Sequence, residues 1–344
     1  MKTIDYQLFL FQFIFAVLVI AVHISFPNQI GFLDSIGRTS VLFFFIVSAY
    51  FNAKAINNDN YHYSDTIKRC IRLFVLEIVA LCIYIPVMVS INMSLSNSTP
   101  KLFSEFSIDN IISFFNIYVP NLGFLWFINA IIICYLLFPF INKIKFLHDK
   151  KAVVIPITVL VVVYILRFFA NKYSNSLGFF SNVMLTRNFL LTGVPCFLIG
   201  LFIHDHLNDL KFITKIRSMQ MLFLFIILMI TSVIEGYFHQ LFGAGENEFY
   251  LSSILLAIVS ICFALSHTEN RIGDVLFYTF GKEIMLVSYL SHRLFIGIGT
   301  LFIDKDCWYL FYLFTIGCVL ILGLLVQLVI NIYKNVRIKI DNAH

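Results

Sequence analysis

The chain is dominated by apolar runs, most of them long enough to cross a lipid bilayer. A helix rises about 1.5 Å per residue, so a hydrocarbon core of about 30 Å requires roughly 20 apolar residues. Of the 344 residues, 60% are hydrophobic and 12% are charged, whereas a soluble domain is roughly half apolar and a quarter charged. The sequence therefore predicts an all-α, polytopic membrane helix bundle of about ten transmembrane helices that forms a single domain, residues 1–344. The ten predicted spans are 6–26, 38–53, 70–91, 122–142, 153–170, 186–204, 219–239, 250–267, 283–303 and 308–333.

Basic residues predict the orientation of these spans. Alternate connections hold 17 of the 24 lysine and arginine residues, and cytoplasmic loops are enriched in these two residue types. Both termini are therefore predicted to be cytoplasmic. The net charge of +5 reflects this orientation and does not indicate a nucleic-acid partner. The seven cysteines are scattered through apolar runs without metal-ligand spacing, so we predict no metal site.

The first span contains polar residues that are costly in lipid. Its sequence "LFLFQFIFAVLVIAVHISF" (8–26) carries Gln12 and His23. At about 100° per residue, Asp5, Gln12 and His23 share one helix face, and His23 lies roughly 27 Å from Asp5 along the axis. Such a stripe is expected to face the bundle interior or a wet cavity. A histidine that only hydrogen-bonds a neighbouring helix remains the alternative.

The third span opens with the basic sequence "KRCIRLF" (68–74). Lys68, Arg69 and Arg72 would suit a phosphate-rich ligand, because arginine offers a fork of donors and lysine a point charge. Without other evidence, the more favoured interpretation is an anchor that fixes the orientation of the span. Glu77 lies further into the same span, as either the partner of these cations or a proton-handling group.

Other polar residues lie near the predicted level of His23. In the ninth span, "SYLSHRLF" (288–295) places Tyr289 and His292 three residues apart with Arg293 beside them, an expensive combination unless the groups face water or a ligand. A polar vestibule at this level is one interpretation, and the ordinary enrichment of polar residues at loop ends is the other. Its further candidate residues are Arg38, Arg187, Asn188, Glu235 and His239.

Several sequence patterns occur in an order that resembles the integral-membrane acyltransferase family 3. They are "AVLVIAVH" (16–23), "RTSVLFFFIVSAYF" (38–51), "KRCIRLF", "GFLWFINAIIICYLLFP" (123–139), "TRNFLLTGVPCFLIG" (186–200) and "SYLSHRLF". Three positions depart from the family pattern. Gln12 stands where an arginine is usual, Ala49 follows Ser48 where glycine is usual, and Arg293 stands where proline is common.

The resemblance implies an O-acyltransferase, foremost an O-acetyltransferase, of the bacterial inner (cytoplasmic) membrane. Its partners would be acyl-CoA, with acetyl-CoA foremost, a glycan or lipid-linked sugar acceptor, and membrane lipid. His23 would act as the general base, and the pantetheine arm of the donor would follow the polar stripe of the first span. The implied catalytic residues are His23, Arg38, Tyr289 and His292. The implied donor-binding residues are Gln12, Lys68, Arg69 and Arg72, and the implied acceptor-binding residues are Trp126, Arg187, Asn188, Glu235 and His239.

Two other functions remain as alternatives. A transporter would also contain buried charges among its spans, but transporters commonly show repeated halves, and the sequence contains no such repeat. A polysaccharide-export or polymerase component would usually carry arginines in a large outer loop, whereas residues 91–121 contain only Lys101 as a basic residue.

Overall fold

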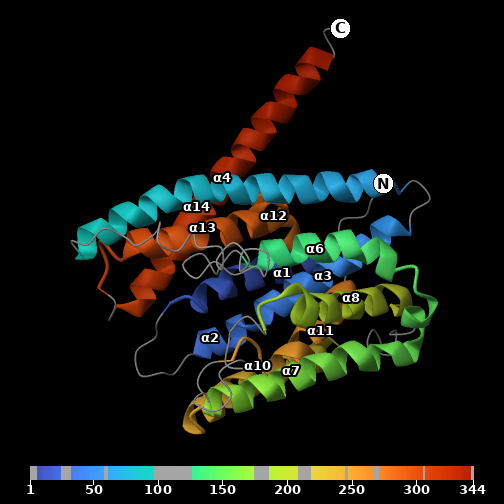
Figure 1. Cartoon of the computed structure of the whole chain (residues 1–344). Coiled ribbons are helices and arrows are strands. Elements are labelled where there is room, and N and C mark those ends of the chain that lie inside the picture. The colour runs from blue at the N-terminus through green and yellow to red at the C-terminus, as the bar shows by residue number, and fades with distance from the viewer. Residues whose placement is uncertain are drawn as a thin grey trace, which may run out of the picture.

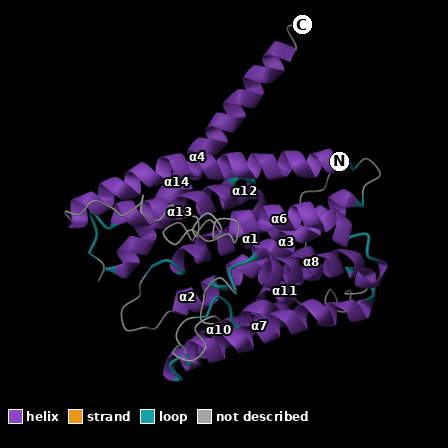
Figure 2. Cartoon of the chain, viewed as in Figure 1, coloured by secondary structure: helices purple, strands orange, loops and turns teal. Residues whose placement is uncertain are grey.

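The computed structural model of the chain describes residues 6–24, 32–57, 61–96, 126–173, 186–207, 218–244, 247–266, 271–304 and 307–341. All regular structure in these residues is helical (Figure 2), which confirms the predicted all-α class. The helices are α1 (Tyr6–Ala21), α2 (Phe32–Gly37), α3 (Thr39–Ile56), α4 (Tyr63–Ser96), α6 (Trp126–Ile141), α7 (Val154–Lys172), α8 (Val194–His206), α10 (Ser218–Leu241), α11 (Leu251–Ser266), α12 (Arg271–Phe280), α13 (Ile284–Gly299) and α14 (Trp308–Asp341).

Each of the ten predicted spans coincides with a helix. Within the described residues, five helical segments are long and apolar enough to cross a membrane: Leu33–Ile56, Lys150–Lys172, Phe189–His206, Leu222–Leu241 and Trp308–Arg337. Four shorter apolar helices are Tyr6–Ala21, Trp126–Ile141, Leu251–Leu265 and Ile284–Gly299. The chain is therefore a multi-pass membrane protein. The count of ten spans and the cytoplasmic location of both termini remain predictions.

Several helix boundaries differ from those of the predicted spans. The first helix ends at Ala21, and the third span is longer than predicted because α4 already begins at Tyr63. The short helices α2 and α12 were not predicted. Both carry an acidic residue in the first turn, Asp34 in α2 and Asp274 in α12, and neither has the length of a span.

Most helices lie side by side, with α4 along one edge of the bundle and α7 and α10 along the opposite edge, while the C-terminal part of α14 projects beyond α4 (Figure 1). Helix α3 lies at the centre, where it packs against α1, α6, α8 and α11. The core is strongly aromatic. Its largest fully buried side chains include Phe15, Phe43, Phe45, Phe138 and Phe197.

The edge helices expose large apolar side chains instead of burying them. Phe74 on α4, Phe169 on α7, Phe223 on α10 and Leu313 on α14 are all exposed. In water such surfaces would be unfavourable, but lipid tails are as apolar as these side chains. These faces are therefore the lipid-contacting surface of the bundle.

The crossing of α3 and α8 depends on a glycine. A Cβ atom at Gly200 would lie 2.4 Å from the carbonyl oxygen of Ile46 and 2.5 Å from the Cβ of Ala49. Small residues allow such close backbone approach between membrane helices, where packing rather than the hydrophobic effect drives association. This contact fixes α3, and with it Arg38 immediately before the helix.

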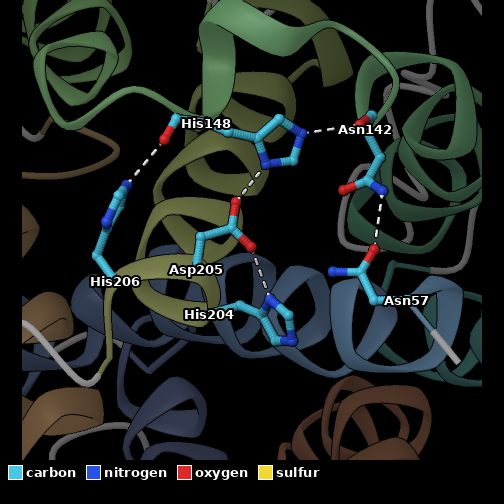
Figure 3. Close-up of polar contacts among 6 residues, drawn as sticks. All are labelled: Asn57, Asn142, His148, His204, Asp205 and His206. Carbon is cyan, nitrogen blue, oxygen red and sulfur yellow. Dashed lines mark hydrogen bonds and ion pairs between the residues drawn. The ribbon is translucent and has the colours of Figure 1, made fainter.

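A polar cluster joins the connection between α6 and α7 to the end of α8 (Figure 3). His148 uses both ring nitrogens: Nδ1 contacts the Asp205 carboxylate, and Nε2 lies 2.8 Å from the carbonyl oxygen of Asn142. His206 donates from Nε2 to the carbonyl oxygen of His148, at 3.0 Å. Because both partners of the His148 ring are acceptors, the cluster favours a doubly protonated imidazolium.

Candidate functional site

The two histidines singled out from the sequence come together. The rings of His23 and His292 are stacked, with centroids 4.9 Å apart and an angle of 26° between their planes. His23 lies in the turn that follows α1 and not on a face of that helix. Its backbone N–H donates to the carbonyl oxygen of Ile20 at 3.1 Å. The prediction that Gln12 and His23 share one helix face is therefore wrong, because α1 ends two residues before His23. Asp5, the third residue of the predicted stripe, lies outside the described residues.

The two rings differ in accessibility. His292 on α13 is fully buried, and its Nδ1 donates to the carbonyl oxygen of Ser288 at 2.9 Å, which leaves the lone pair of a neutral ring on Nε2. The hydroxyl of Ser288 in turn donates to the carbonyl oxygen of Ala16 at 2.9 Å and holds α13 against α1. His23 is only partly buried. A ligand can therefore reach His23 more readily than His292.

Three guanidinium groups lie within electrostatic range of His23. They belong to Arg38, Arg187 and Arg293. Arg38 is buried between α2 and α3, where its Nε donates to Asp34 at 3.0 Å and its Nη1 donates to the carbonyl oxygen of Asn247. This concentration of positive charge would stabilise an oxyanion that develops beside His23.

Glu248 partly balances this charge. Its carboxylate lies 2.9 Å from Nη2 of Arg187, in the connection between α10 and α11. Burial raises the pKa of Glu248, but the guanidinium groups of Arg187 and Arg38 outweigh burial and lower it below its ordinary value. Arg187 is therefore held by an ionised partner and fixed in orientation.

Tyr289 and Trp126 lie where α13 meets the start of α6. The ring of Tyr289 is 6.1 Å from that of His292, and its hydroxyl oxygen bonds the backbone of Phe127 and Ile128. Trp126 is buried in the core, with its ring 6.0 Å from that of Phe45. The tyrosine thus joins the histidine pair to α6, while the tryptophan occupies a packing position.

The basic residues of α4 diverge. Lys68 is exposed and lies 3.5 Å from Asp65. Arg69 points into the bundle, where it donates to Asn52 at 3.1 Å and lies 5.4 Å from the ring centre of Tyr135. Arg72 is exposed and lies 3.9 Å from Glu283, just before α13.

Glu77 is not the partner of these cations. Its buried carboxylate accepts a hydrogen bond from Asn129 of α6 at 3.0 Å. The nearest described carboxylate to Arg72 is that of Glu283. Of the two interpretations of Glu77, pairing with the basic cluster is therefore wrong.

Three of the proposed acceptor-binding residues make structural contacts. Asn188 accepts from the N–H of Leu191 at 2.7 Å and caps the π-helical turn Phe189–Gly193. Glu235 caps α11, because its carboxylate accepts from the N–H groups of Leu251 and Ser252 at 2.9 and 3.1 Å. His239 bonds the hydroxyl of Tyr164 through Nε2, at 2.9 Å. Glu235 and His239 line a groove between α7, α10 and α11.

Sequence reasoning missed the anionic partners of the central site, Asp34 and Glu248. Arginines placed among apolar helices require partners, and this requirement was the available signal. Asp34 precedes Arg38 by one helical turn, a spacing that pairs opposite charges. Gln12 remains a partly buried residue on α1. Among the described residues, no group of three His, Cys, Asp or Glu side chains forms a metal site.

These features define a polytopic membrane protein whose bundle holds a stacked histidine pair among arginines. A family model described as an acyltransferase domain, that of acyltransferase family 3, matches residues 5–330. The chain belongs to this family and is a membrane acyltransferase, as the sequence resemblance predicts. Searches of curated proteins and of solved structures gave no significant match.

Proposed function

We propose that the protein is an O-acyltransferase of a bacterial cytoplasmic membrane that transfers an acyl group, foremost acetyl, from acyl-CoA to a hydroxyl of a surface or lipid-linked glycan. The observation that carries this proposal is the partly accessible ring of His23, stacked on His292 within range of Arg38, Arg187 and Arg293. An imidazole is a suitable base near neutral pH, and adjacent cations favour a developing oxyanion.

The proposed reaction balances without another reactant. Nε2 or Nδ1 of His23 takes the proton of the acceptor hydroxyl while its oxygen attacks the thioester carbonyl. The oxyanion of the tetrahedral intermediate lies near the arginines, collapses to the ester and expels the CoA thiolate. The His23 imidazolium then returns the proton to this thiolate, so that the products are the acylated glycan and CoA.

We infer a donor path between α4 and α13 rather than along the polar stripe of α1. Arg72 of α4 lies near Glu283 at the start of α13, and Tyr84, further along α4, hydrogen-bonds Arg293 of α13. The twelve residues from Arg72 to Tyr84 cover roughly 18 Å of helix axis. A pantetheine arm would cross this distance with its phosphates near Arg69 and Arg72.

Calorimetry of acetyl-CoA with the purified chain in detergent tests the donor site. The double variant Arg69→Gln/Arg72→Gln should bind at least about tenfold more weakly, because charge-assisted hydrogen bonds contribute about 1.5–3 kcal/mol each. Lys334→Gln, which removes a charge from the exposed end of α14, is the control and should bind as the wild type does. Equal binding by all three proteins would reduce the basic cluster to an orientation anchor. If the wild type does not bind acetyl-CoA, the donor assignment fails and the transporter alternative gains support.

Acyl transfer by His23 variants tests the base. His23→Gln should retain acetyl-CoA binding and lose about 10²–10⁴-fold in turnover, the usual contribution of general-base catalysis. The exposed His62 provides a matched control, and His62→Gln should keep full turnover. Turnover of His23→Gln at the wild-type rate would remove His23 from the mechanism.

A further inference from the structure

A groove of about 510 Å³ lies between α7, α10 and α11. Its floor contains the buried side chains of Leu228, His239 and Ser252, and its rim includes the exposed side chains of Phe238 and Leu255. The volume lies within the range of small-molecule binding sites. The groove is therefore large enough to hold part of a ligand.

The groove opens onto the lipid-contacting surface of the bundle. Its own lining includes exposed apolar side chains of α10 and α11, such as Ile234 and Leu255. In a bilayer the medium in front of these side chains is hydrocarbon. The occupant must therefore carry an apolar chain.

The groove is somewhat longer than the hydrocarbon part of one lipid leaflet. Its lining residues extend along α10 from Leu228 to Phe242, which corresponds to roughly 20 Å of helix axis. One leaflet contributes about 15 Å, half of the hydrocarbon thickness. A lipid chain that lies in one leaflet can therefore follow about three quarters of the groove, and the remaining length lies at the level of the headgroups.

Toward one end the groove is polar, with the carboxylate of Glu235 in its lining and the ammonium group of Lys172 beyond the rim. The Nζ of Lys172, at the end of α7, lies 5.7 Å from the ring centre of the rim residue Phe242. Within the described part of the chain, Nδ1 of the buried His239 has no hydrogen-bond partner. The sequence predicts this end to face outward. A lipid phosphate placed here would meet the ammonium group of Lys172.

We propose that this groove binds an anionic phospholipid of the bilayer, with one acyl chain along α10 and its phosphate against Lys172. The charge at the polar end, the apolar rim and the length of the floor favour this occupant. The proposal concerns a site separate from the His23 pair and does not depend on acyl transfer.

Native mass spectrometry of the full chain in detergent tests the proposal with phosphatidylglycerol and phosphatidylcholine of identical acyl chains. The wild type should retain phosphatidylglycerol about fivefold better, the effect of about 1 kcal/mol from one lysine near a lipid headgroup. Lys172→Gln should bring this ratio close to one. Thr231→Trp, which places a large side chain at the exposed rim, should reduce retention of both lipids.

Two matched controls separate the groove from general lipid contact. Phe223→Trp changes an exposed residue of α10 that does not line the groove, and Lys145→Gln removes an exposed charge at the opposite end of the bundle. Both control variants should retain the two lipids as the wild type does. Thermal unfolding of each variant checks that it is folded. A wild-type lipid ratio in folded Lys172→Gln, together with wild-type retention of both lipids by folded Thr231→Trp, would overturn the proposal. So would retention of a polyisoprenyl phosphate in place of phosphatidylglycerol, which would assign the groove to a lipid-linked acceptor.

Discussion

Replacing Gly200 with alanine should weaken the packing of α3 against α8. The new Cβ would lie 2.4 Å from the carbonyl oxygen of Ile46, whereas ordinary contacts begin at 3.4 Å, so the two helices must separate by about 1 Å locally. The contacted atoms are backbone and the Cβ of Ala49, which cannot rotate away. Overpacking of this kind costs about 1–3 kcal/mol, while replacing an interior helical glycine contributes at most about 1 kcal/mol in the opposite direction.

Subtracting the full glycine contribution leaves a net destabilisation of roughly 0–2 kcal/mol, which corresponds to a decrease in Tm of up to about 6 °C. Thermal unfolding in detergent, followed by helical circular dichroism, measures this change. Gly317→Ala is the matched control, because a Cβ at Gly317 on α14 meets nothing within 4 Å; its Tm should stay constant or rise. If the two variants melt together, the proposed close crossing of α3 and α8 is refuted.

Two further predictions concern polar contacts outside the histidine pair. Burial lowers the pKa of His148, but its hydrogen bonds to the Asn142 carbonyl and to Asp205 outweigh burial and raise the pKa above its ordinary value. The resulting stability is fully present below about pH 6.5 and is lost as the pH rises through the folded-state pKa. The free energy of unfolding of the wild type should thus fall by about 1 kcal/mol between pH 6 and pH 8.5, a modest value because the His148 ring is partly exposed. In His148→Gln the free energy of unfolding should not show this pH dependence. Parallel pH profiles of the two proteins would contradict the assignment. Glu235→Ala should destabilise the protein by about 0.5–2 kcal/mol through loss of the α11 cap, with acetyl-CoA affinity unchanged, and an unaltered Tm would argue against the cap.

The sequence alone predicts the class of protein and the positions of the helices well. In hydrocarbon every backbone polar group must be satisfied internally, so an apolar run of sufficient length becomes a helix. This rule explains why each predicted span coincides with a helix. It does not predict where a helix ends when the next residues are also apolar. For that reason the end of α1 at Ala21 could not be predicted, since the apolar pattern continues to Phe26.

The family could also be predicted from the sequence, because its patterns are local and occur in a fixed order. The identity of the polar residues that approach one another could not. His23 and His292 come from distant parts of the chain, and their stacking depends on how α1 and α13 rotate about their axes when they pack.

The same limit applies to the cations and carboxylates. Lys68, Arg69 and Arg72 are neighbours in sequence, yet only Arg69 points into the bundle, because successive residues of a helix face different directions. The role of Glu235 as the cap of α11 depends on the approach of that helix and could not be predicted from the sequence, while its predicted binding of an acceptor stays a prediction. The sequence by itself determined that this protein lies in a membrane, where its helices are, and to which family it belongs. Only tertiary packing decided which polar side chains share a site, because that depends on the relative rotation and depth of helices that are far apart in the chain.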